Sequence, residues 1–196
     1  MKQKIGVVIL AAGNSSRLGT PKQLQLFRGK NLLQHSIDCC TSQQINSRVI
    51  VLGANLQSII PKINTDPSEI VFNKKWEEGM GESLSFAIKE ILKKEDDLAH
   101  ILVCLSDQPF ISTELIQQLI DKHLQEKNCI TLCNYANIEG VPAIFNRAVF
   151  NELMELKGDK GAKAIIDKYD TSSIPFPLGK IDIDTPEDLN SLKGYE

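Results

Sequence analysis

Charged side chains follow several apolar segments of this 196-residue chain, directly where each segment ends. After an apolar run at residues 4–10 comes a loop of small residues that also carries two cations, Arg17 and Lys22. Backbone N–H groups in such a loop can surround an anion, a guanidinium can form paired hydrogen bonds with phosphate oxygens, and an ammonium adds a point charge. We therefore predict that residues 11–22 form an anion-binding loop.

An acidic residue follows another apolar run. Asp107 comes just after residues 101–105, and burying its carboxylate costs free energy unless a cation accompanies it. Mg²⁺, which proteins hold with one or two carboxylates and the phosphates of a substrate, would be such a cation. Asp184 is the second candidate ligand. It follows a predicted short strand at residues 180–183, on the same face as Asp182, and could reach the same ion if that strand lies beside the run that precedes Asp107.

Two familiar phosphate-binding motifs are missing from the first loop. Gly13 and Gly19 are separated by five residues and Thr20 follows, so the loop does not match G-x-x-x-x-G-K-[ST]. A G-x-G-x-x-G motif does not follow the first apolar run either, which argues against a dinucleotide-binding dehydrogenase.

The distribution of charge agrees with a local anion site. The net charge is −3, yet residues 1–37 contain six cations and no acid, and the remainder sums to −9. An acidic protein without a broad basic face is a poor candidate for binding nucleic acid. A segregated basic end instead favours a small anionic ligand.

Composition excludes several other classes of protein. No run of 18 uncharged apolar residues occurs, so we expect no membrane span. The five cysteines are odd in number and form no C-x-x-C pair, which argues against a disulfide framework or a zinc site. We expect most of them to be buried thiols in a cytoplasmic protein.

The elements that must position these residues alternate along the chain. Continuous apolar texture predicts strands covered on both faces at residues 4–10, 48–52, 69–72, 101–105 and 129–133. Helices are predicted to begin near Asn31, after Gly81 and at Ser112. Later elements are predicted as strands at residues 141–145 and 180–183 and helices at residues 147–156, 162–169 and 187–192. This alternation predicts a single α/β domain over residues 1–196, a Rossmann-like three-layer αβα sandwich with a mostly parallel sheet. Its ligands should bind at the carboxyl ends of the strands.

Six segments spread over nearly the whole chain form one pattern of motifs. The first is LAAGNSSRLGTPKQ, and the others are GMGESL, CLSDQPFIS, GVPAIF, GDKGAK and DIDTPEDL. In content and order these segments resemble the molybdenum-cofactor cytidylyltransferases, a family within the nucleotide-diphospho-sugar transferase superfamily, and the first is similar to the family's signature loop L-A-A-G-x-S-x-R-x-G-x-x-K.

This resemblance implies a role for each matching position. Leu10, Ala11, Ala12, Gly13, Arg17, Lys22, Gly81 and Ser83 would bind the nucleotide. Arg17, Lys22 and Asp107 would be catalytic, and Asp107 and Asp184 would hold Mg²⁺. Gly140, Pro142, Gly158, Asp159 and Gly161 would bind the acceptor. Guanylyltransferase relatives usually have a second glycine at the position of Ala12, so the resemblance favours CTP over GTP.

The implied activity is transfer of CMP from CTP to the terminal phosphate of a molybdenum-bound pterin, with release of pyrophosphate. Such a nucleophile is already anionic and needs no general base, so His35, His100 and His123 are interpreted as structural residues. Three alternatives stay open: use of GTP or another nucleotide, a sugar phosphate or methylerythritol phosphate as acceptor, and a non-catalytic nucleotide-binding accessory protein. A molybdoenzyme or accessory protein that receives the product would be a transient partner.

Overall fold

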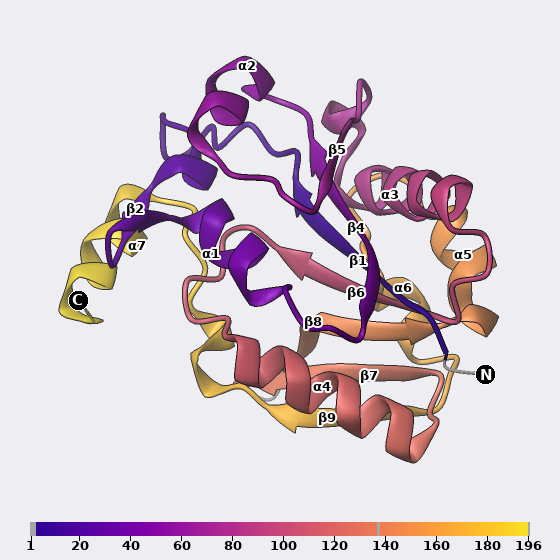
Figure 1. Ribbon diagram of the computed structural model, residues 1–196. Helices are drawn as coiled ribbons and strands as arrows, with labels where there is room; N and C mark the ends of the chain where they lie inside the picture. The colour runs from indigo at the N-terminus through magenta and orange to yellow at the C-terminus, as the bar shows by residue number, and fades with distance from the viewer. Residues whose placement is uncertain (1–2, 137, 196) are drawn as a thin grey trace.

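A seven-stranded sheet forms the centre of the protein in a computed structural model, which describes residues 3–136 and 138–195 (Figure 1). Its strands, in spatial order, are β5 (Glu69–Phe72), β4 (Ile45–Leu52), β1 (Ile5–Ala11), β6 (His100–Leu105), β8 (Ile138–Asn146), β7 (Ile130–Tyr135) and β9 (Thr171–Pro175). β8 runs antiparallel to both of its neighbours, and the other pairings in this sheet are parallel. The predicted mostly parallel sheet is therefore confirmed.

Helices cover both faces of this sheet. On one face lie α1 (Leu32–Cys39), α2 (Leu56–Ile59) and α4 (Thr113–Glu126), and on the other lie α3 (Met80–Lys94), α5 (Phe150–Met154) and α6 (Lys163–Ile166). Alternate residues of β1 face the two layers, because side chains along a strand point to opposite sides. Both faces being covered explains why β1 is apolar throughout, and the predicted three-layer αβα sandwich is confirmed.

The remaining elements are short. A hairpin of β2 (Leu26–Phe27) and β3 (Lys30–Asn31) precedes α1, and α7 (Pro186–Leu192) lies near the end of the chain. Short 3-10 helices span Lys22–Leu24, Ile60–Lys62, Trp76–Glu78, Arg147–Val149, Pro177–Lys180 and Lys193–Tyr195.

Capping side chains start the helices where the sequence predicts them. The Asn31 side chain accepts a hydrogen bond from the backbone N–H of Gln34, and Ser112 accepts one from Leu115. Pro186 occupies the first turn of α7, as predicted.

Some predicted elements are wrong in type or extent. Residues 180–183 do not form a strand: a 3-10 helix ends at Lys180, and the following segment pairs with the neighbouring β6–α4 loop through one hydrogen bond, from Ile183 N to Asp107 O at 3.1 Å. The helix predicted at residues 147–156 divides into a 3-10 turn and α5, and the helix predicted at residues 162–169 shortens to α6. β9 has no counterpart in the sequence-based prediction because its half-buried, serine-containing segment lacks the continuous apolar texture.

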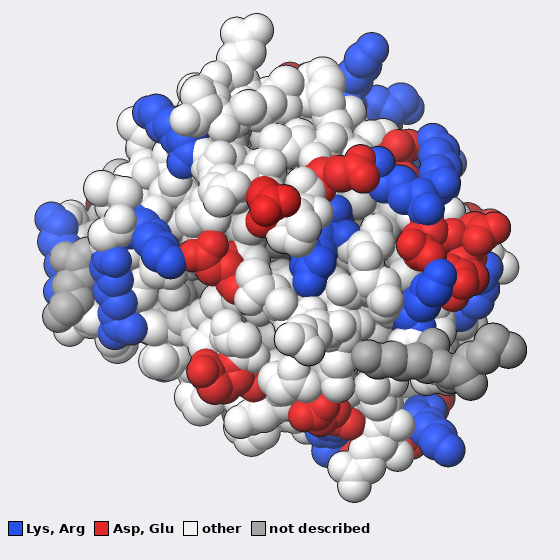
Figure 2. Space-filling model, viewed as in Figure 1, with Lys and Arg blue, Asp and Glu red and all other residues white. Residues whose placement is uncertain are grey.

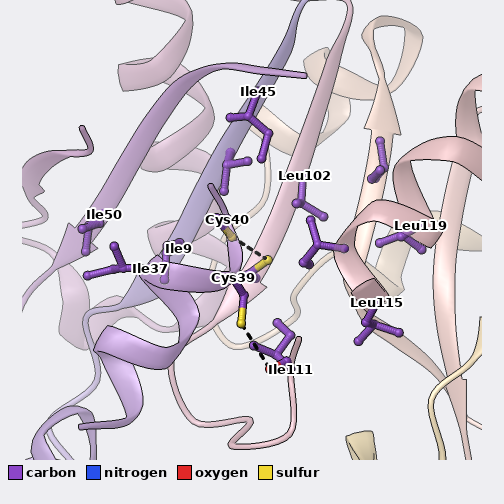
Figure 3. Packing of buried hydrophobic residues seen from close by; sticks show 14 of the residues in the cluster. Ile9, Ile37, Cys39, Cys40, Ile45, Ile50, Leu102, Ile111, Leu115 and Leu119 are labelled. Carbon is purple, nitrogen blue, oxygen red and sulfur yellow. Dashed lines mark hydrogen bonds between the residues drawn. The ribbon is translucent and has the colours of Figure 1, made fainter. Parts of the chain in front are cut away.

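The cysteines behave as small core residues. All five are free thiols, and Cys39, Cys40, Cys104 and Cys133 are buried, whereas Cys129 is partly exposed. Figure 3 shows Cys39 and Cys40 packed among Ile9, Ile37 and Ile111, and the Cys39 thiol donates to the Ile111 carbonyl. Burial raises the pKa of the Cys39 and Cys133 thiols to about 12, so both stay protonated at neutral pH.

One face of the molecule carries charges of both signs (Figure 2). On the face shown in Figure 2, acidic and basic side chains alternate, and no broad basic patch appears there. Within the described part of the chain, no helix combines the length and the apolar character needed to cross a bilayer.

Two buried histidines lie at the amino end of β6, opposite the edge where Asp107 lies. His123 Nε2 is 2.9 Å from His100 Nδ1, and His123 Nδ1 is 2.8 Å from Thr131 Oγ1. Burial and then the charge of His100 lower the pKa of His123 to about 4, and burial lowers the pKa of His100. Both rings are therefore neutral at pH 7 and serve the fold, in line with their interpretation as structural residues.

This pair predicts a loss of stability in mild acid. A histidine whose folded pKa lies below its unfolded value of about 6.5 contributes full stability above that value and loses it as the pH falls toward the folded pKa. From pH 7.5 to pH 5, His123 should cost about 2 kcal/mol of unfolding free energy. Urea unfolding at both pH values would measure how far the unfolding free energy falls. The fall should be about 2 kcal/mol smaller in His123→Gln than in the wild type, and equal falls would contradict the low pKa of His123.

Candidate active site

A cavity of about 340 Å³ opens at the carboxyl edge of β1 and β6. The chain adds β4 and β5 on one side of β1 and then returns to add β6 on the other, so β1 and β6 flank the position where the strand order reverses. Open α/β sheets bind ligands at such positions. The cavity wall comprises Leu10, Ala11, Ala12, Gly13, Asn14, Lys22, Gln23, Trp76, Glu77, Gly79, Met80, Ser83, Leu105, Ser106, Asp107 and Asp159.

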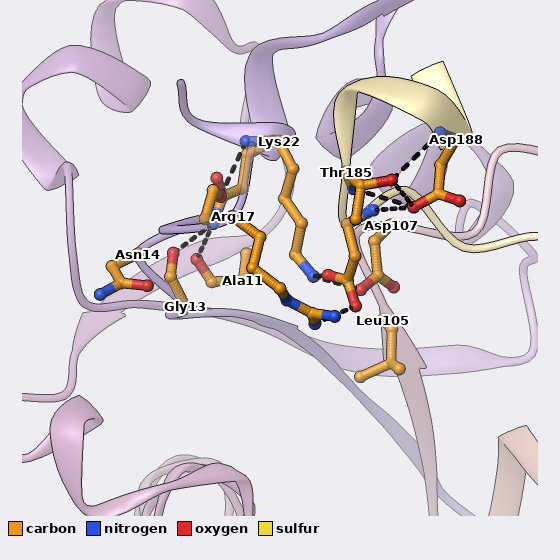
Figure 4. Close-up of polar contacts among 12 residues, drawn as sticks. Ala11, Gly13, Asn14, Arg17, Lys22, Leu105, Asp107, Thr185 and Asp188 are labelled. Atoms are coloured by element: carbon orange, nitrogen blue, oxygen red, sulfur yellow. Dashed lines mark hydrogen bonds and ion pairs between the residues drawn. The ribbon is translucent and has the colours of Figure 1, made fainter. Parts of the chain in front are cut away.

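Two cations and two acids meet at the edge of this cavity. The Lys22 ammonium lies 2.6 Å from Asp107 Oδ2 and 2.8 Å from Asp184 Oδ1, and so joins the two carboxylates. The Arg17 guanidinium donates to Asp184 Oδ2 at 2.6 Å. Figure 4 shows both cationic side chains extending from the loop after β1 toward the acids. Residues far apart in the sequence therefore form one charged cluster. Asp107 and Asp184 lie close together in it, although the sequence analysis expected this only if a strand preceded Asp184.

Burial strengthens these interactions. Desolvation opposes the charged form of Lys22, but the carboxylates of Asp107 and Asp184 more than offset it, so the pKa of Lys22 lies above its ordinary value. Desolvation also opposes the charge of Asp184, and hydrogen bonds and attraction from Lys22 and Arg17 still hold its pKa below the ordinary value. Both side chains are thus ionised at neutral pH.

The acids fit a divalent cation that is shared with a substrate. Asp107 Oδ1 is buried and has no hydrogen-bond partner among the described residues, so one carboxylate oxygen is available as a ligand. Asp182 adds a third nearby acid, and burial followed by repulsion from Asp107 raises its pKa. No group of three or more His, Cys, Asp or Glu in the described ranges is arranged as a complete metal cage. Mg²⁺ and Mn²⁺ commonly bind through one or two carboxylates plus phosphates, which matches this arrangement.

A buried glutamine supports the loop that follows β1. The side-chain amide of Gln23 donates to the carbonyls of Ala11 at 2.8 Å and Gly13 at 3.0 Å. The side chain of Gln23 is fully buried, and its Oε1 atom has no partner among the described residues. By donating to two carbonyls, Gln23 restrains residues 11–13, which belong to the loop that the sequence predicts to bind an anion.

Gln23→Ala should weaken nucleotide binding. Without the amide, two carbonyls lose their donor, so the loop should relax and KM for the nucleotide should rise about tenfold with a smaller change in kcat. Steady-state kinetics would measure KM and kcat separately. Gln25→Ala is the matched control, because the Gln25 amide bonds Thr20 and Pro21 in a more exposed part of the same loop. Equal effects of the two variants would contradict a specific role for Gln23.

The opposite wall of the cavity joins two glycine-rich segments. Gly79 and Gly158 adopt positive φ angles of 109° and 64°, and the Gly81 N–H donates to the Gly158 carbonyl at 2.7 Å. This contact places Asp159 on the cavity wall. Ser83 also lines the cavity, and its hydroxyl accepts a hydrogen bond from the Asn73 amide.

The structure brings most of the predicted site residues to one place. Eight of them line the cavity: Leu10, Ala11, Ala12, Gly13, Lys22, Ser83, Asp107 and Asp159. Arg17 and Asp184 lie at its edge, joined to Lys22 through the charged cluster. Gly81, Gly158 and Gly161 support the wall from behind: Gly81 contacts Gly158, and Gly161 lies against Met80.

The remaining two predicted acceptor residues lie further along the same sheet edge. Gly140 and Pro142 belong to the start of β8, whose antiparallel course brings them to the carboxyl end of β6. Gln108 connects this region to Asp107, since its amide donates to the Val141 carbonyl at 3.1 Å. Neither Gly140 nor Pro142 is part of the described cavity wall.

Several wall residues have no role in the sequence-based prediction. Trp76 and Met80 form an apolar side of the cavity, and Ser106 directly precedes the predicted metal ligand Asp107. Trp76 packs so closely on Gly53 that a Cβ atom there would lie 2.5 Å from Trp76 Cβ. The sequence offered one signal for this wall, because the single tryptophan of the chain follows closely after the apolar run at residues 69–72.

The other cations of the basic amino-terminal segment lie away from the cavity wall. Lys4 pairs with Glu95 and Asp97, and Lys30 pairs with Asp38. Arg28 donates to the Tyr195 carbonyl, and Lys2 lies outside the described residues. Only two cations of this segment therefore belong to the charged cluster in the described part of the chain.

Comparison with known proteins gives a consistent family. Residues 7–172 match the family described as the MobA-like NTP transferase domain. Nicotine blue oxidoreductase from Paenarthrobacter nicotinovorans is 31% identical, over 94% of each chain. The bifunctional protein GlmU from Desulfitobacterium hafniense is 28% identical over 89% of this chain, which spans only 38% of the length of that protein.

Solved structures share the whole fold. The crystal structure of Rv0371c from Mycobacterium tuberculosis H37Rv has a TM-score of 0.85 and 29% identity, and covers 98% of both chains. A structure of the same protein in complex with manganese has a TM-score of 0.79 and 26% identity, with 97% of both chains covered.

Proposed function

The chain belongs to the MobA-like NTP transferase family, and we propose that it transfers CMP from CTP to the terminal phosphate of a molybdenum-bound pterin, releasing pyrophosphate. The observation that carries this proposal is the charged cluster, in which Lys22 joins Asp107 and Asp184 at the mouth of a cavity lined by residues 10–13. Cations for a triphosphate and acids for a metal thus lie beside backbone donors for a nucleotide.

The chain's own residues supply binding and charge. The terminal phosphate of the acceptor would form a bond to the α-phosphorus of CTP as the bond to pyrophosphate breaks, and this anionic nucleophile carries no proton that a base must remove. Arg17 and Lys22 would hold the triphosphate and offset the charge that develops on the leaving pyrophosphate. Mg²⁺ held by Asp107 and Asp184 would act as a Lewis acid on phosphoryl oxygens.

The experiment that tests this function identifies the product directly. The protein is incubated with Mg²⁺, each of the four nucleoside triphosphates and a panel of acceptors: molybdenum-bound molybdopterin, sugar phosphates and methylerythritol phosphate. We expect pyrophosphate release and, by mass spectrometry, a cytidylylated pterin. Product with GTP or with another phosphate would support the alternative transferases. Nucleotide binding without any turnover would support an accessory role.

Ala12→Gly should change the choice of base. Ala12 is buried at the end of β1, and its carbonyl accepts a hydrogen bond from Ala54 N. Removing its methyl group makes room for a larger base, so the ratio of kcat/KM for CTP to that for GTP should fall about tenfold. Competition kinetics with the two nucleotides would measure the ratio. An unchanged ratio would place discrimination elsewhere in the cavity.

An oxidoreductase is the second candidate function, because 31% identity over 94% of each chain relates this protein to nicotine blue oxidoreductase. The loop after β1 lacks the G-x-G-x-x-G motif, which weighs against binding of a dinucleotide in the usual manner. The test is to measure, by absorbance, whether the protein oxidises NADH or NADPH in the presence of a quinonoid dye. Oxidation without pyrophosphate release would support the oxidoreductase, and pyrophosphate release without oxidation would support the transferase.

We further propose that residues 1–196 act as one nucleotidyltransferase domain in the cytoplasm. The five free thiols suit a reducing compartment. A labile cofactor product would be passed to a transient partner, such as a molybdoenzyme or an accessory protein.

A further inference from the structure

Lys22 occupies the position between the two carboxylates that a metal ion would share. Its ammonium is 2.6 Å from Asp107 and 2.8 Å from Asp184. We propose that Lys22 is an internal substitute for the metal, and that metal and nucleotide triphosphate bind cooperatively because the metal releases Lys22 to the phosphates. This inference rests on the proposed function for the identity of the nucleotide.

Charge balance supports an exchange. Lys22 and Arg17 together carry two positive charges and pair with the two negative charges of Asp107 and Asp184. One divalent cation would neutralise the same two acids. The two basic side chains would then be free to pair with the triphosphate, and the charge of the protein cluster would be balanced before and after the exchange.

Burial makes the exchange obligatory for Lys22. The side chains of Lys22 and Asp107 are only 17% and 11% exposed, so separating them without a replacement leaves an unpaired, partly desolvated charge. Arg17 is 68% exposed, and its bond to Asp184 can be replaced by water at little cost. Lys22 therefore leaves the carboxylates only when another cation replaces it, whereas Arg17 can leave Asp184 for solvent.

The geometry also leaves one carboxylate oxygen of Asp107 without a partner in the described part of the chain, and a metal could bind it. Asp107 uses Oδ2 to bind Lys22, whereas the buried Oδ1 atom has no partner among the described residues. A cation arriving at Oδ1 would repel the ammonium and favour its departure toward an anion. Because coupling between two ligands is reciprocal, a bound triphosphate that attracts Lys22 would strengthen metal binding by the same factor.

Metal binding in the absence of nucleotide tests the substitution. Electron paramagnetic resonance would measure the affinity for Mn²⁺ alone in the wild type, in Lys22→Met and in Lys22→Arg. Removing the competing cation should tighten Mn²⁺ binding about tenfold or more in Lys22→Met, whereas Lys22→Arg keeps the charge and should stay within about threefold of the wild type. Equal or weaker binding of Mn²⁺ by Lys22→Met would overturn the proposal.

A second experiment tests whether weakening the hold of Asp184 on Lys22 and Arg17 frees these side chains to bind a triphosphate. It does not depend on the folding of Lys22→Met. Binding of CTP in EDTA is compared between Asp184→Asn and Asp182→Asn by calorimetry. Each variant removes one negative charge near the cluster. Among the described residues, Asp184 accepts hydrogen bonds from Lys22 and Arg17, whereas Asp182 accepts none from them. CTP should bind more tightly to Asp184→Asn, and equal affinities would overturn the proposal. The Mn²⁺ measurement contains no nucleotide, so a failure of the proposed function leaves its outcome interpretable.

Discussion

Asp107→Asn should lower kcat/KM for nucleotidyl transfer by about a thousandfold or more while the fold persists. Asparagine has the shape of aspartate but carries no charge, so the substitution weakens both the attraction for Lys22 and the ability to bind a divalent cation. We expect this loss to be large because Asp107 Oδ1 is buried and has no hydrogen-bond partner among the described residues, so no neighbouring group would replace the carboxylate as a metal ligand. The backbone carbonyl of Asp107, which accepts from Ile183 N, is unaffected.

Initial rates of pyrophosphate release at saturating Mg²⁺ would measure this effect, with thermal unfolding as the check on the fold. Asp38→Asn is the control, since Asp38 pairs with Lys30 on the surface and should leave the rate unchanged. Activity of Asp107→Asn within tenfold of the wild type would remove Asp107 from the proposed metal site.

The sequence predicts the convergence of Arg17, Lys22 and Asp107 because of a general property of parallel sheets. The apolar texture of β1 and β6 identifies both as strands buried on two faces, and the carboxyl ends of parallel strands lie at one edge. Local patterns were therefore sufficient to place these side chains together before any contact was known.

Asp184 reaches the same cluster for a reason that no local pattern contains. The strand predicted before it does not exist, and the segment instead donates one backbone hydrogen bond, from Ile183 N to Asp107 O, to the loop after β6. Ile183 is also buried with Phe27 and Leu192, from opposite parts of the chain. Asp184 therefore lies near Asp107 through tertiary packing, which period-two spacing cannot describe.

Gln23 shows a second limit of sequence-based prediction. A glutamine between a lysine and a leucine has no distinctive pattern, and whether its side chain faces solvent or the loop depends on the short 3-10 turn at Lys22–Leu24. The turn directs the amide inward, where it meets two carbonyls of the β1 loop. Its role becomes visible only once the path of the backbone is known.

The predicted acceptor residues illustrate the same limit at a larger scale. The motifs around Gly140 and Gly158 follow each other along the chain and are implied by the resemblance to serve one pocket. In the structure, the first lies on β8 beside Gln108, and the second packs against the start of α3. The contact between Gly81 and Gly158 connects two motifs that are 77 residues apart, which is a property of helix packing rather than of either motif.

Gly81→Ala tests this contact and should have the second largest effect. A Cβ atom at Gly81 would lie 2.6 Å from the Lys160 carbonyl oxygen, 2.9 Å from that of Gly158 and 3.0 Å from that of Lys157. All three oxygens belong to the backbone, so the loop that carries Asp159 must move away. We expect stability to fall by about 1–3 kcal/mol and kcat/KM to fall about a hundredfold, because the displaced loop opens one wall of the cavity.

Gly161→Ala is the matched control for this prediction, since it introduces the same methyl group from the other side of the packing between this loop and α3. Its Cβ atom would lie 3.4 Å from Met80 Sδ, an ordinary contact with a flexible side chain, and it should change stability by less than about 0.5 kcal/mol. Urea unfolding and steady-state kinetics on the two variants would separate the effect of the carbonyl contacts from that of lost glycine flexibility. Similar behaviour of Gly81→Ala and Gly161→Ala would show that the loop adapts to the methyl group, and that its packing against α3 does not set the shape of the cavity.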